Sequence, residues 1–331
     1  MTILAFGTSL PEMQSEGLYS GANGGTVATA NYIAPNVAEG ISIGRDANPL
    51  HFGFDFTPTA DLWFSFYFTS SNNIATGVPF FMVYGGGVEL FRLQQAGGPI
   101  LQYHNNTSWQ SSGVVMRYAE NFRTRFDCHF VVHDSTGTLT VYIDGQEQTQ
   151  ANFGPGDTLL RGESLMDEVR WDHPITAGSV QAYISACFVS TTDTRMLTYV
   201  QRAIDGAGAE TDWTGAYTDI DEAGGDDADL IQASTNADKA TYTFAALPAS
   251  FNAGYSVPAL GVSARASSGA ASPANLQLAA RHSTTNGFSA NNLLSSVFGP
   301  HQATFVLNPS TSLAWTFAEA DAAEVGVQAI T

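Results

Sequence analysis

Positive charge is scarce in this sequence. Its 331 residues include 12 Lys and Arg against 31 Asp and Glu, and Lys239 is the only lysine. The formal net charge is therefore −19 at pH 7. A surface this acidic repels phosphate groups, so the composition disfavours a protein that binds or packages nucleic acid.

Cysteine and long apolar runs are also scarce. Cys128 and Cys187 are the only cysteines, so neither a disulfide framework nor a Cys-x-x-Cys metal motif is expected. The first residues lack a basic segment followed by an apolar one, and no apolar run reaches the roughly 20 residues that span a bilayer. We therefore expect no signal peptide, no membrane insertion and folding in a reducing cytosol.

The sequence is rich in apolar residues arranged with a period of two. Hydrophobic residues make up 44% of the chain and charged residues 13%, a balance typical of a protein with a real core. Clear alternation occurs in Leu62–Phe68, Phe126–Val132 and Ser179–Phe188. Period two predicts strands with one buried face. The residues expected to share such a face in the last range are Val180, Ala182, Ile184, Ala186 and Phe188.

Turn signals separate these strands. Phe80–Tyr84 and Val88–Leu93 flank three glycines, which predicts a hairpin because glycine tolerates positive φ. The dipeptide Asp144-Gly145 is suited to a type I′ hairpin turn. Together these patterns predict an all-β protein of antiparallel, jelly-roll-like β-sandwiches.

A shift in composition near residue 190 predicts two β-sandwich domains, residues 1–189 and 190–331. The second contains the acidic range Asp205–Asp229, in which there is no basic residue. Further strand-like runs follow, separated by Ser, Ala, Gly and Pro. Near the C-terminus, Trp315–Ala323 is expected to form one short helix before a closing strand over Val325–Ile330.

The acidic range also contains the best candidates for metal binding. Close carboxylates repel one another, so either a cation lies between them or the loop is extended in water. Ca²⁺ takes six to eight oxygen ligands of this kind. The range lacks the spacing of an EF-hand, and no other cofactor is expected. The candidate ligands are Asp219, Asp221, Glu222, Asp226 and Asp227.

Trp63 and Tyr67 are expected on the strand face opposite Phe64 and Phe66. Because one face of a sandwich sheet belongs to the core, aromatic residues on the other face need cover or a purpose. Sugar binding uses aromatic rings in this way, and so do contacts between protein surfaces. Trp63 and Tyr67 are therefore candidate contacts for a partner, with protein favoured over glycan.

Three patterns in the sequence are similar to those of catalytic or metal sites. Gly40–Gly44 matches the Gly-x-Ser-x-Gly string of serine hydrolases, but Arg45–Pro49 cannot open the helix that this chemistry needs. His129 and His133 lie about 13 Å apart along a strand, too far to share one metal ion without further ligands. The acids within Glu163–Asp172 do not place two consecutive carboxylates on one strand face, as many glycosidases require. We therefore expect a protein that is not an enzyme.

Residues Arg125–Glu147 read RFDCHFVVHDSTGTLTVYIDGQE, two alternating runs that end in Asp-Gly. This pattern resembles the two adjacent central strands of the laminin-G-like, or concanavalin-A-like, jelly-roll superfamily. The resemblance covers roughly residues 1–189 and implies that fold. It implies no single function, because the fold hosts lectins, adhesins, hydrolases and virion proteins alike.

The C-terminal half contains an ordered set of short motifs. These are Thr192–Met196, Trp213–Glu222, Asp226-Asp227, Asn308–Thr316 and Glu324–Val327. In this order they resemble the β-sandwich modules of tailed-bacteriophage structural proteins, which often follow a laminin-G-like domain. Met196 departs from the pattern, which has glycine after the arginine of the first motif.

The resemblance implies a non-enzymatic virion protein: a fibre, spike or decoration subunit of head or tail, exposed and host-adhesive. Its expected partners are other virion proteins, further copies of itself and a host-surface glycan. Its expected location is the virion, after synthesis in the host's bacterial cytoplasm. The alternative hypothesis is a carbohydrate-binding module or receptor-binding protein, and a third hypothesis is a glycoside hydrolase or lyase.

Overall fold

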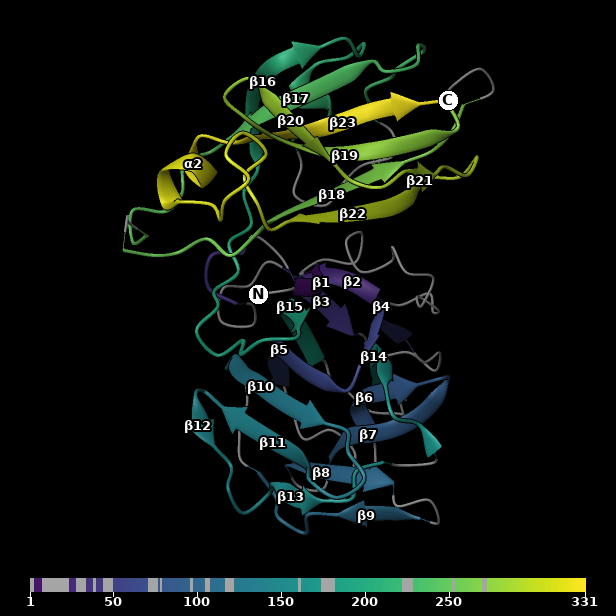
Figure 1. Cartoon of the computed structure of the whole chain (residues 1–331), viewed down its shortest axis with the longest axis vertical. Helices are drawn as coiled ribbons and strands as arrows, with labels where there is room; N and C mark the ends of the chain where they lie inside the picture. Colours follow the sequence, from purple (N-terminus) through teal and green to yellow (C-terminus); the bar gives the residue numbers. More distant parts are fainter. Residues whose placement is uncertain are drawn as a thin grey trace. The chain divides into compact units, whose positions relative to one another are not determined.

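The computed structural model forms two compact units, Thr2–Tyr199 and Val200–Thr331 (Figure 1). The structure describes residues 3–7, 24–27, 34–37, 40–43, 50–70, 77, 79–95, 98–104, 108–116, 122–159, 162–173, 182–221, 229–251, 254–269 and 273–331. Within these ranges nearly all regular structure is antiparallel strand, which confirms the predicted all-β class. Among the same residues, no helix has the length and apolar character needed to span a membrane.

The first unit is a sandwich of two antiparallel sheets. Its nine-stranded sheet contains β1 (Ile3–Gly7), β2 (Gly24–Val27), β3 (Gly40–Ile43), β5 (Asp61–Ser70), β10 (Thr124–Val131), β11 (Gly137–Ile143), β12 (Gln146–Glu147), β13 (Phe153–Gly156) and β15 (Ala182–Ser190). Its six-stranded sheet has the order β4 (Leu50–Thr59), β14 (Met166–His173), β6 (Pro79–Gly85), β7 (Val88–Gln95), β8 (Pro99–His104) and β9 (Trp109–Ser111). As expected, β10 and β11 are adjacent.

The core between these sheets is largely aromatic. Phe64 and Phe66 of β5 pack on Phe81 of β6, with ring centroids 4.4 and 5.2 Å apart. Trp171 of β14 meets Phe66 edge-on at 5.5 Å. All four side chains are fully buried. Since burying one such side chain contributes about 1.5–3 kcal/mol, these contacts can hold the sandwich without disulfides.

Both predicted hairpins of the first unit are confirmed. Strands β6 and β7 are joined through Gly86 and Gly87, whose φ values are 56° and 76°. After β11 the chain turns at Asp144 and Gly145, with φ values of 48° and 77°. Two consecutive residues of positive φ are what a type I′ turn requires.

One predicted face is wrong because β15 contains a bulge. Its register with β5 shifts between Ser185 and Phe188, and Ala186 has a φ of 49°. The extra residue reverses the alternation, since side chains on a strand point to opposite faces in turn. Cys187 therefore joins the core, whereas Phe188 lies on the opposite face, near the guanidinium of Arg125.

The second unit also contains two packed sheets. Its six-stranded sheet consists of β16 (Ile204–Thr211), β17 (Lys239–Phe244), β23 (Glu324–Ile330), β19 (Asn275–His282), β20 (Thr285–Phe288) and β21 (Asn292–Leu293). Strands β18 (Leu260–Ala266) and β22 (Gly299–Phe305) pair with each other. Val262 of β18 and Phe305 of β22 pack against Leu276 and Leu278 of β19, which gives a second, smaller sandwich.

The predicted short helix and closing strand are present. Helix α2 covers Phe317–Asp321, and β23 follows it directly. Thr316 caps the helix: its hydroxyl accepts from the backbone N–H of Glu319, and its own N–H donates to the Glu319 carboxylate at 2.9 Å. This reciprocal pair satisfies two backbone donors at the helix start.

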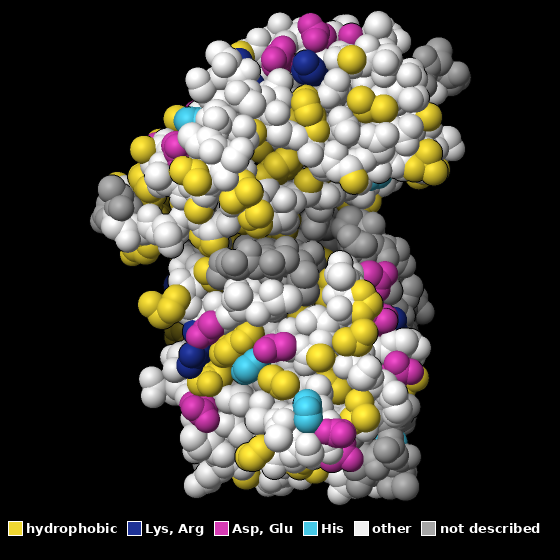
Figure 2. All heavy atoms as spheres, in the orientation of Figure 1, with side chains coloured by type: hydrophobic (Ala, Val, Ile, Leu, Met, Phe, Trp, Pro, Cys, Tyr) yellow, Lys and Arg dark blue, Asp and Glu magenta, His cyan; other side chains and the backbone are white. Residues whose placement is uncertain are grey.

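The acidic side chains do not form a single patch on the face drawn in Figure 2. They are spread among uncharged residues, and few Lys or Arg side chains appear beside them. On this face the strongly negative net charge is therefore diffuse.

Candidate functional site

Trp63 and Tyr67 lie on the outer face of the nine-stranded sheet, but the chain itself covers this face. Residues 191–199, here called the strap, run across it after β15. Thr194 of the strap is fully buried, and its hydroxyl lies 2.6 Å from that of Ser65 on β5. The strap belongs to the first unit for this reason, so the compact unit ends at Tyr199 rather than at residue 189.

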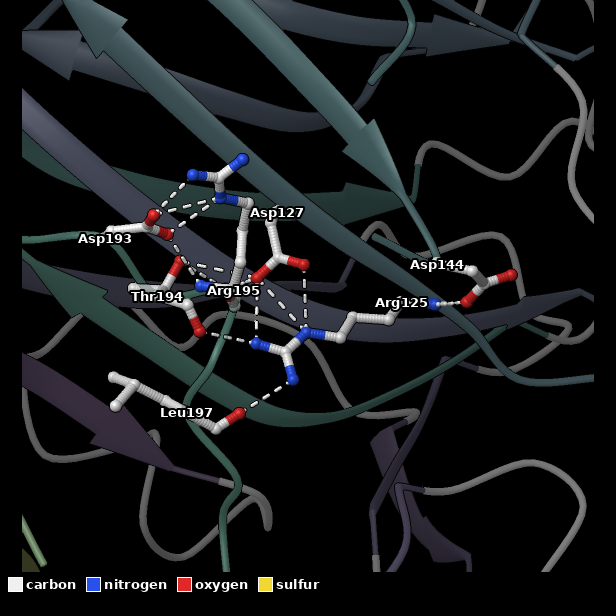
Figure 3. A network of polar contacts seen from close by, with 8 residues as sticks. Arg125, Asp127, Asp144, Asp193, Thr194, Arg195 and Leu197 are labelled. Atoms are coloured by element: carbon white, nitrogen blue, oxygen red, sulfur yellow. Dashed lines mark hydrogen bonds and ion pairs between the residues drawn. The ribbon is translucent and has the colours of Figure 1, made fainter. Parts of the chain in front are cut away.

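Arg125 of β10 anchors the strap (Figure 3). Its guanidinium donates to both carboxylate oxygens of Asp127 at 2.9–3.1 Å. The remaining N–H groups donate to the backbone oxygens of Thr194 at 2.6 Å and Leu197 at 2.7 Å. Because the Asp127 carboxylate is only 1% exposed, Arg125 supplies the countercharge that its burial requires.

The outer part of the strap covers Trp63. Arg195 forms a fork with Asp193, and its guanidinium lies 4.4 Å from the ring centroid of Tyr142 and 5.2 Å from that of Trp63. Trp63 also stacks on His129 at 4.2 Å, and only 9% of Trp63 is exposed. The hydrogen bonds that Arg195 donates to the Asp193 carboxylate hold the pKa of Asp193 below its ordinary value. Tyr67 is half-buried beside Arg125. Residues of the chain itself therefore cover Trp63 and part of Tyr67.

The outer face of the first unit's six-stranded sheet carries a different set of side chains. Its inner face contributes Phe81, Val83 and Trp171 to the core, so the alternating residues point outward. Strand register aligns two rows of these outward residues. One row contains Gly53, Arg170, Met82, Arg92, Gln102 and Ser111, and the other contains Asp55, Glu168, Tyr84 and Glu89. We call this surface the Arg92–Arg170 face.

Arg170 of β14 forms the first polar group on this face. Its guanidinium donates to one Glu168 carboxylate oxygen at 2.5 and 2.7 Å. The same guanidinium lies 4.6 Å from the ring centroid of Tyr84 on β6. An arginine stacked on an aromatic ring and bonded to a carboxylate is held in one orientation, with its free edge available.

Arg92 of β7 forms a second group of the same kind. Its guanidinium lies 3.8 Å from the ring centroid of Trp109 on β9, and its Nε donates to Gln102 at 2.6 Å. Glu89 supplies a countercharge at 3.7 Å. Partial burial lowers the pKa of the Arg92 guanidinium. The face therefore repeats one pattern twice: an arginine, an aromatic ring and a carboxylate.

Two carboxylates lie directly opposite each other on adjacent strands of this face. Asp55 of β4 and Glu168 of β14 are register partners, and such residues have Cβ atoms roughly 4.5–5.5 Å apart. Burial raises the pKa of the Glu168 carboxyl above its ordinary value, against the opposing effect of Arg170. The pKa of Asp55 is raised by burial and by the nearby Asp167.

Sequence reasoning missed this face. Glu163–Asp172 lacks two carboxylates on one face of a single strand, and the carboxylate that faces Glu168 comes from β4, more than a hundred residues earlier. The available signal was the polar alternation within Asp167–Asp172, where Glu168 and Arg170 alternate with Val169 and Trp171. That alternation identifies an outward face but does not identify the strands beside it.

The candidate cation ligands are only partly described. The Asp219 carboxylate accepts from the backbone N–H of Ala216 at 2.8 Å and closes the 3-10 turn η3 (Tyr217–Asp219). Asp221 follows it, whereas Glu222, Asp226 and Asp227 lie outside the described residues. In the described ranges no three His, Cys, Asp or Glu side chains come together in a way that could hold a metal ion.

The serine of the Gly-x-Ser-x-Gly string and the histidine pair lie in or beside strands of the first unit. Ser42 lies within strand β3, opposite Tyr183 of β15, and not on a turn between a strand and a helix. His129 bonds Asp61 at 2.8 Å, whereas His133 bonds its neighbours Asp134 and Ser135.

Comparison with known proteins gives likenesses of fold alone. No protein-family model matches the chain, and no curated protein matches it. Among similar solved structures, a mutant of alginate lyase Aly36B in complex with an alginate tetrasaccharide is 10% identical, with a TM-score of 0.38 over 57% of this chain and 93% of the lyase. Alginate lyase vAL-1 from Chlorella virus is 11% identical, with a TM-score of 0.40 over 57% of this chain and 99% of the lyase.

The botulinum neurotoxin serotype G binding domain is also similar. It is 9% identical, with a TM-score of 0.40 over 57% of this chain and 47% of that structure. The presence of alginate lyases among these structures corrects the expectation that the chain is not an enzyme. That expectation rested on motifs read along single strands, whereas a sandwich sheet assembles its outer faces across strands.

Proposed function

We propose that this chain is a surface component of a tailed-phage virion whose first unit recognises carbohydrate through the Arg92–Arg170 face. The virion part of the proposal rests on the ordered motifs of the C-terminal half. The carbohydrate part rests on the paired arginine, aromatic and carboxylate groups of the first unit. Other virion proteins are the proposed partners of the chain within the particle.

The observation that carries the proposal is the contrast between the two outer faces. On the nine-stranded sheet the strap contacts Ser65 and Arg195 lies over Trp63, which is only 9% exposed. On the other sheet Arg92 and Arg170 keep 18% and 28% of their side chains exposed. Sugars offer hydroxyl groups to planar hydrogen-bonding side chains and C–H faces to aromatic rings. Such groups bind with least loss of entropy when strands hold them in place, as they do here.

A glycan array with the full chain tests the carbohydrate part. We expect saturable binding to at least one glycan, and we expect Arg92→Ala or Trp109→Ala to remove it. Arg195→Ala is the matched control, because Arg195 also stacks on an aromatic ring but belongs to the strap. An array with no saturable hit refutes the proposal. Immunogold labelling of purified particles tests the virion part, and unlabelled particles refute it.

Cleavage of the bound glycan is a second candidate, favoured by Asp55 and Glu168. Hydrolysis of a glycosidic bond needs one carboxylic acid to protonate the leaving oxygen and one carboxylate to attack or to activate water. Raised pKa values are typical of the protonated partner. New reducing ends released from the glycan that binds, and lost in Glu168→Gln with folding intact, support this function. Binding without release of reducing or unsaturated ends excludes it.

A further inference from the structure

Each arginine of the Arg92–Arg170 face already has a carboxylate partner within the protein. Arg170 is paired with Glu168, and Arg92 with Glu89. Asp55 lies near Arg170, and Asp167 lies near both Asp55 and Glu168, so acids outnumber bases here by four to two. Like charges repel strongly near a protein surface, so an incoming carboxylate meets a net repulsion from the excess acids.

The two arginine groups are separated across the strands. Arg170 of β14, Met82 of β6 and Arg92 of β7 are successive register partners. Neighbouring strands are about 4.8 Å apart, so the two arginines lie roughly 10 Å from each other in one row. On the edge strand β9 the row ends at Ser111, and Trp109, two residues earlier, contacts the Arg92 guanidinium at 3.8 Å. A ligand that contacts both groups must therefore run across the strands.

We infer that the Arg92–Arg170 face binds an uncharged polysaccharide chain that lies across the strands from β14 to β9. This inference rests on the proposed function and names its ligand class. The free edges of the two guanidinium groups and the Gln102 amide contact hydroxyl groups of successive sugars. The carboxylates exclude acidic polysaccharides such as alginate, even though alginate lyases share the sandwich architecture.

Immobilised polysaccharides of both charge classes test the inference. The uncharged set contains glucan, mannan, galactan, xylan and chitin, and the acidic set contains alginate, pectate and hyaluronan. We expect saturable binding to at least one uncharged polymer and to none of the acidic ones. Binding to an acidic polymer overturns the inference but leaves the proposed function intact. Binding to no polysaccharide in either set, with the glycan array also blank, refutes both.

The proposed orientation of the ligand across the strands can be tested with oligosaccharides of increasing length, prepared from the polymer that binds. Affinity should rise with chain length until the ligand reaches both arginines, and then level off. Arg92→Ala and Arg170→Ala should each weaken the long oligomer at least about tenfold, which corresponds to 1.4 kcal/mol. Arg195→Ala should leave its affinity unchanged. Equal affinity for the monosaccharide and the long oligomer overturns the proposed placement.

A gain of binding gives a test that loss of folding cannot imitate. The double variant Asp55→Asn, Glu89→Gln removes two carboxylates and leaves both arginines in place. We expect this variant to bind alginate at low ionic strength and to release it as salt is added, since salt screens charge. A well-folded variant that still ignores alginate contradicts the role given to the carboxylates.

Discussion

Arg125 and Thr194 lie in different parts of the first unit's sequence, yet the Arg125 guanidinium donates to the Thr194 backbone oxygen at 2.6 Å. This bond crosses from the central strand β10 to the strap. It is part of a network in which Asp127, almost fully buried, accepts from Arg125 on one side and from Ser65 on the other. The strap is therefore an integral part of the sheet's outer layer.

We expect Arg125→Ala to destabilise the first unit and to loosen the strap. Removing one partner of a buried ion pair costs about 3–5 kcal/mol, because Asp127 would be left without its countercharge. Trypsin should then cut after Arg195 faster than in the wild type. Urea unfolding and the cleavage rate measure the two effects.

Gln146→Ala is the control for this experiment, since Gln146 is an exposed hairpin residue of the same sheet. It should shift stability by no more than about 0.5 kcal/mol. If Arg125→Ala matches this control in both measurements, Arg125 does not hold the strap.

A second prediction concerns Phe130 in the aromatic core. Phe130 is fully buried and packs edge-on against Phe64 at 5.1 Å and Phe91 at 5.0 Å. Phe130→Ala should cost about 3–5 kcal/mol of unfolding free energy, because it leaves a cavity. Phe122→Ala makes the same change at a side chain that is 60% exposed and should cost far less. Similar losses in both variants would contradict the assignment of Phe130 to the core.

The alternation that places Phe130 in the core is one of the features that could be predicted from the sequence. Period two and turn residues depend on local chemistry, so the strands around Phe64, Phe130 and Leu139 were predictable. Strand β16 was not, because Gly206, Ala207 and Gly208 have low strand propensity. There a glycine is needed, since a Cβ at Gly208 would lie within 2.6 Å of Thr241.

The outer faces could not be predicted for a different reason. Which residues become neighbours on a sheet depends on strand order and register, and these are set by long-range pairing. Asp55 and Glu168 are opposed only because β14 inserts beside β4. Likewise, Thr192–Met196 reads as the start of a second module, whereas its buried Thr194 belongs to the first unit.

The bulge in β15 gives a third prediction. Ala186 has a φ of 49°, in a region where a Cβ costs roughly 1–2 kcal/mol. Ala186→Gly removes that strain, so its midpoint in urea should equal or exceed that of the wild type. Ala182→Gly makes the same change in the same strand, at a position without positive φ, and should lose about 0.5–1 kcal/mol. If the two variants lose stability equally, Ala186 does not adopt the bulge conformation.

The last prediction concerns the pH dependence of stability around Glu168. Burial raises the pKa of this carboxyl in the folded protein above its ordinary value of 4.5. Between pH 4.5 and the raised pKa, the folded state binds more protons than the unfolded state. The contribution of Glu168 to stability therefore falls as the pH rises through this range. Glu168→Gln removes this titration and should lose less stability than the wild type between acidic and neutral pH.

Thermal unfolding at a series of pH values measures this difference in slope. The slope is the appropriate measure because Glu168→Gln also weakens the pairing with Arg170, which shifts stability at every pH. Glu147→Gln, at an exposed hairpin position, controls for the change of side chain. If the wild type and Glu168→Gln show parallel curves from acidic to neutral pH, Glu168 is not protonated more readily in the folded state. The general-acid role offered for it above would then lose its physical basis.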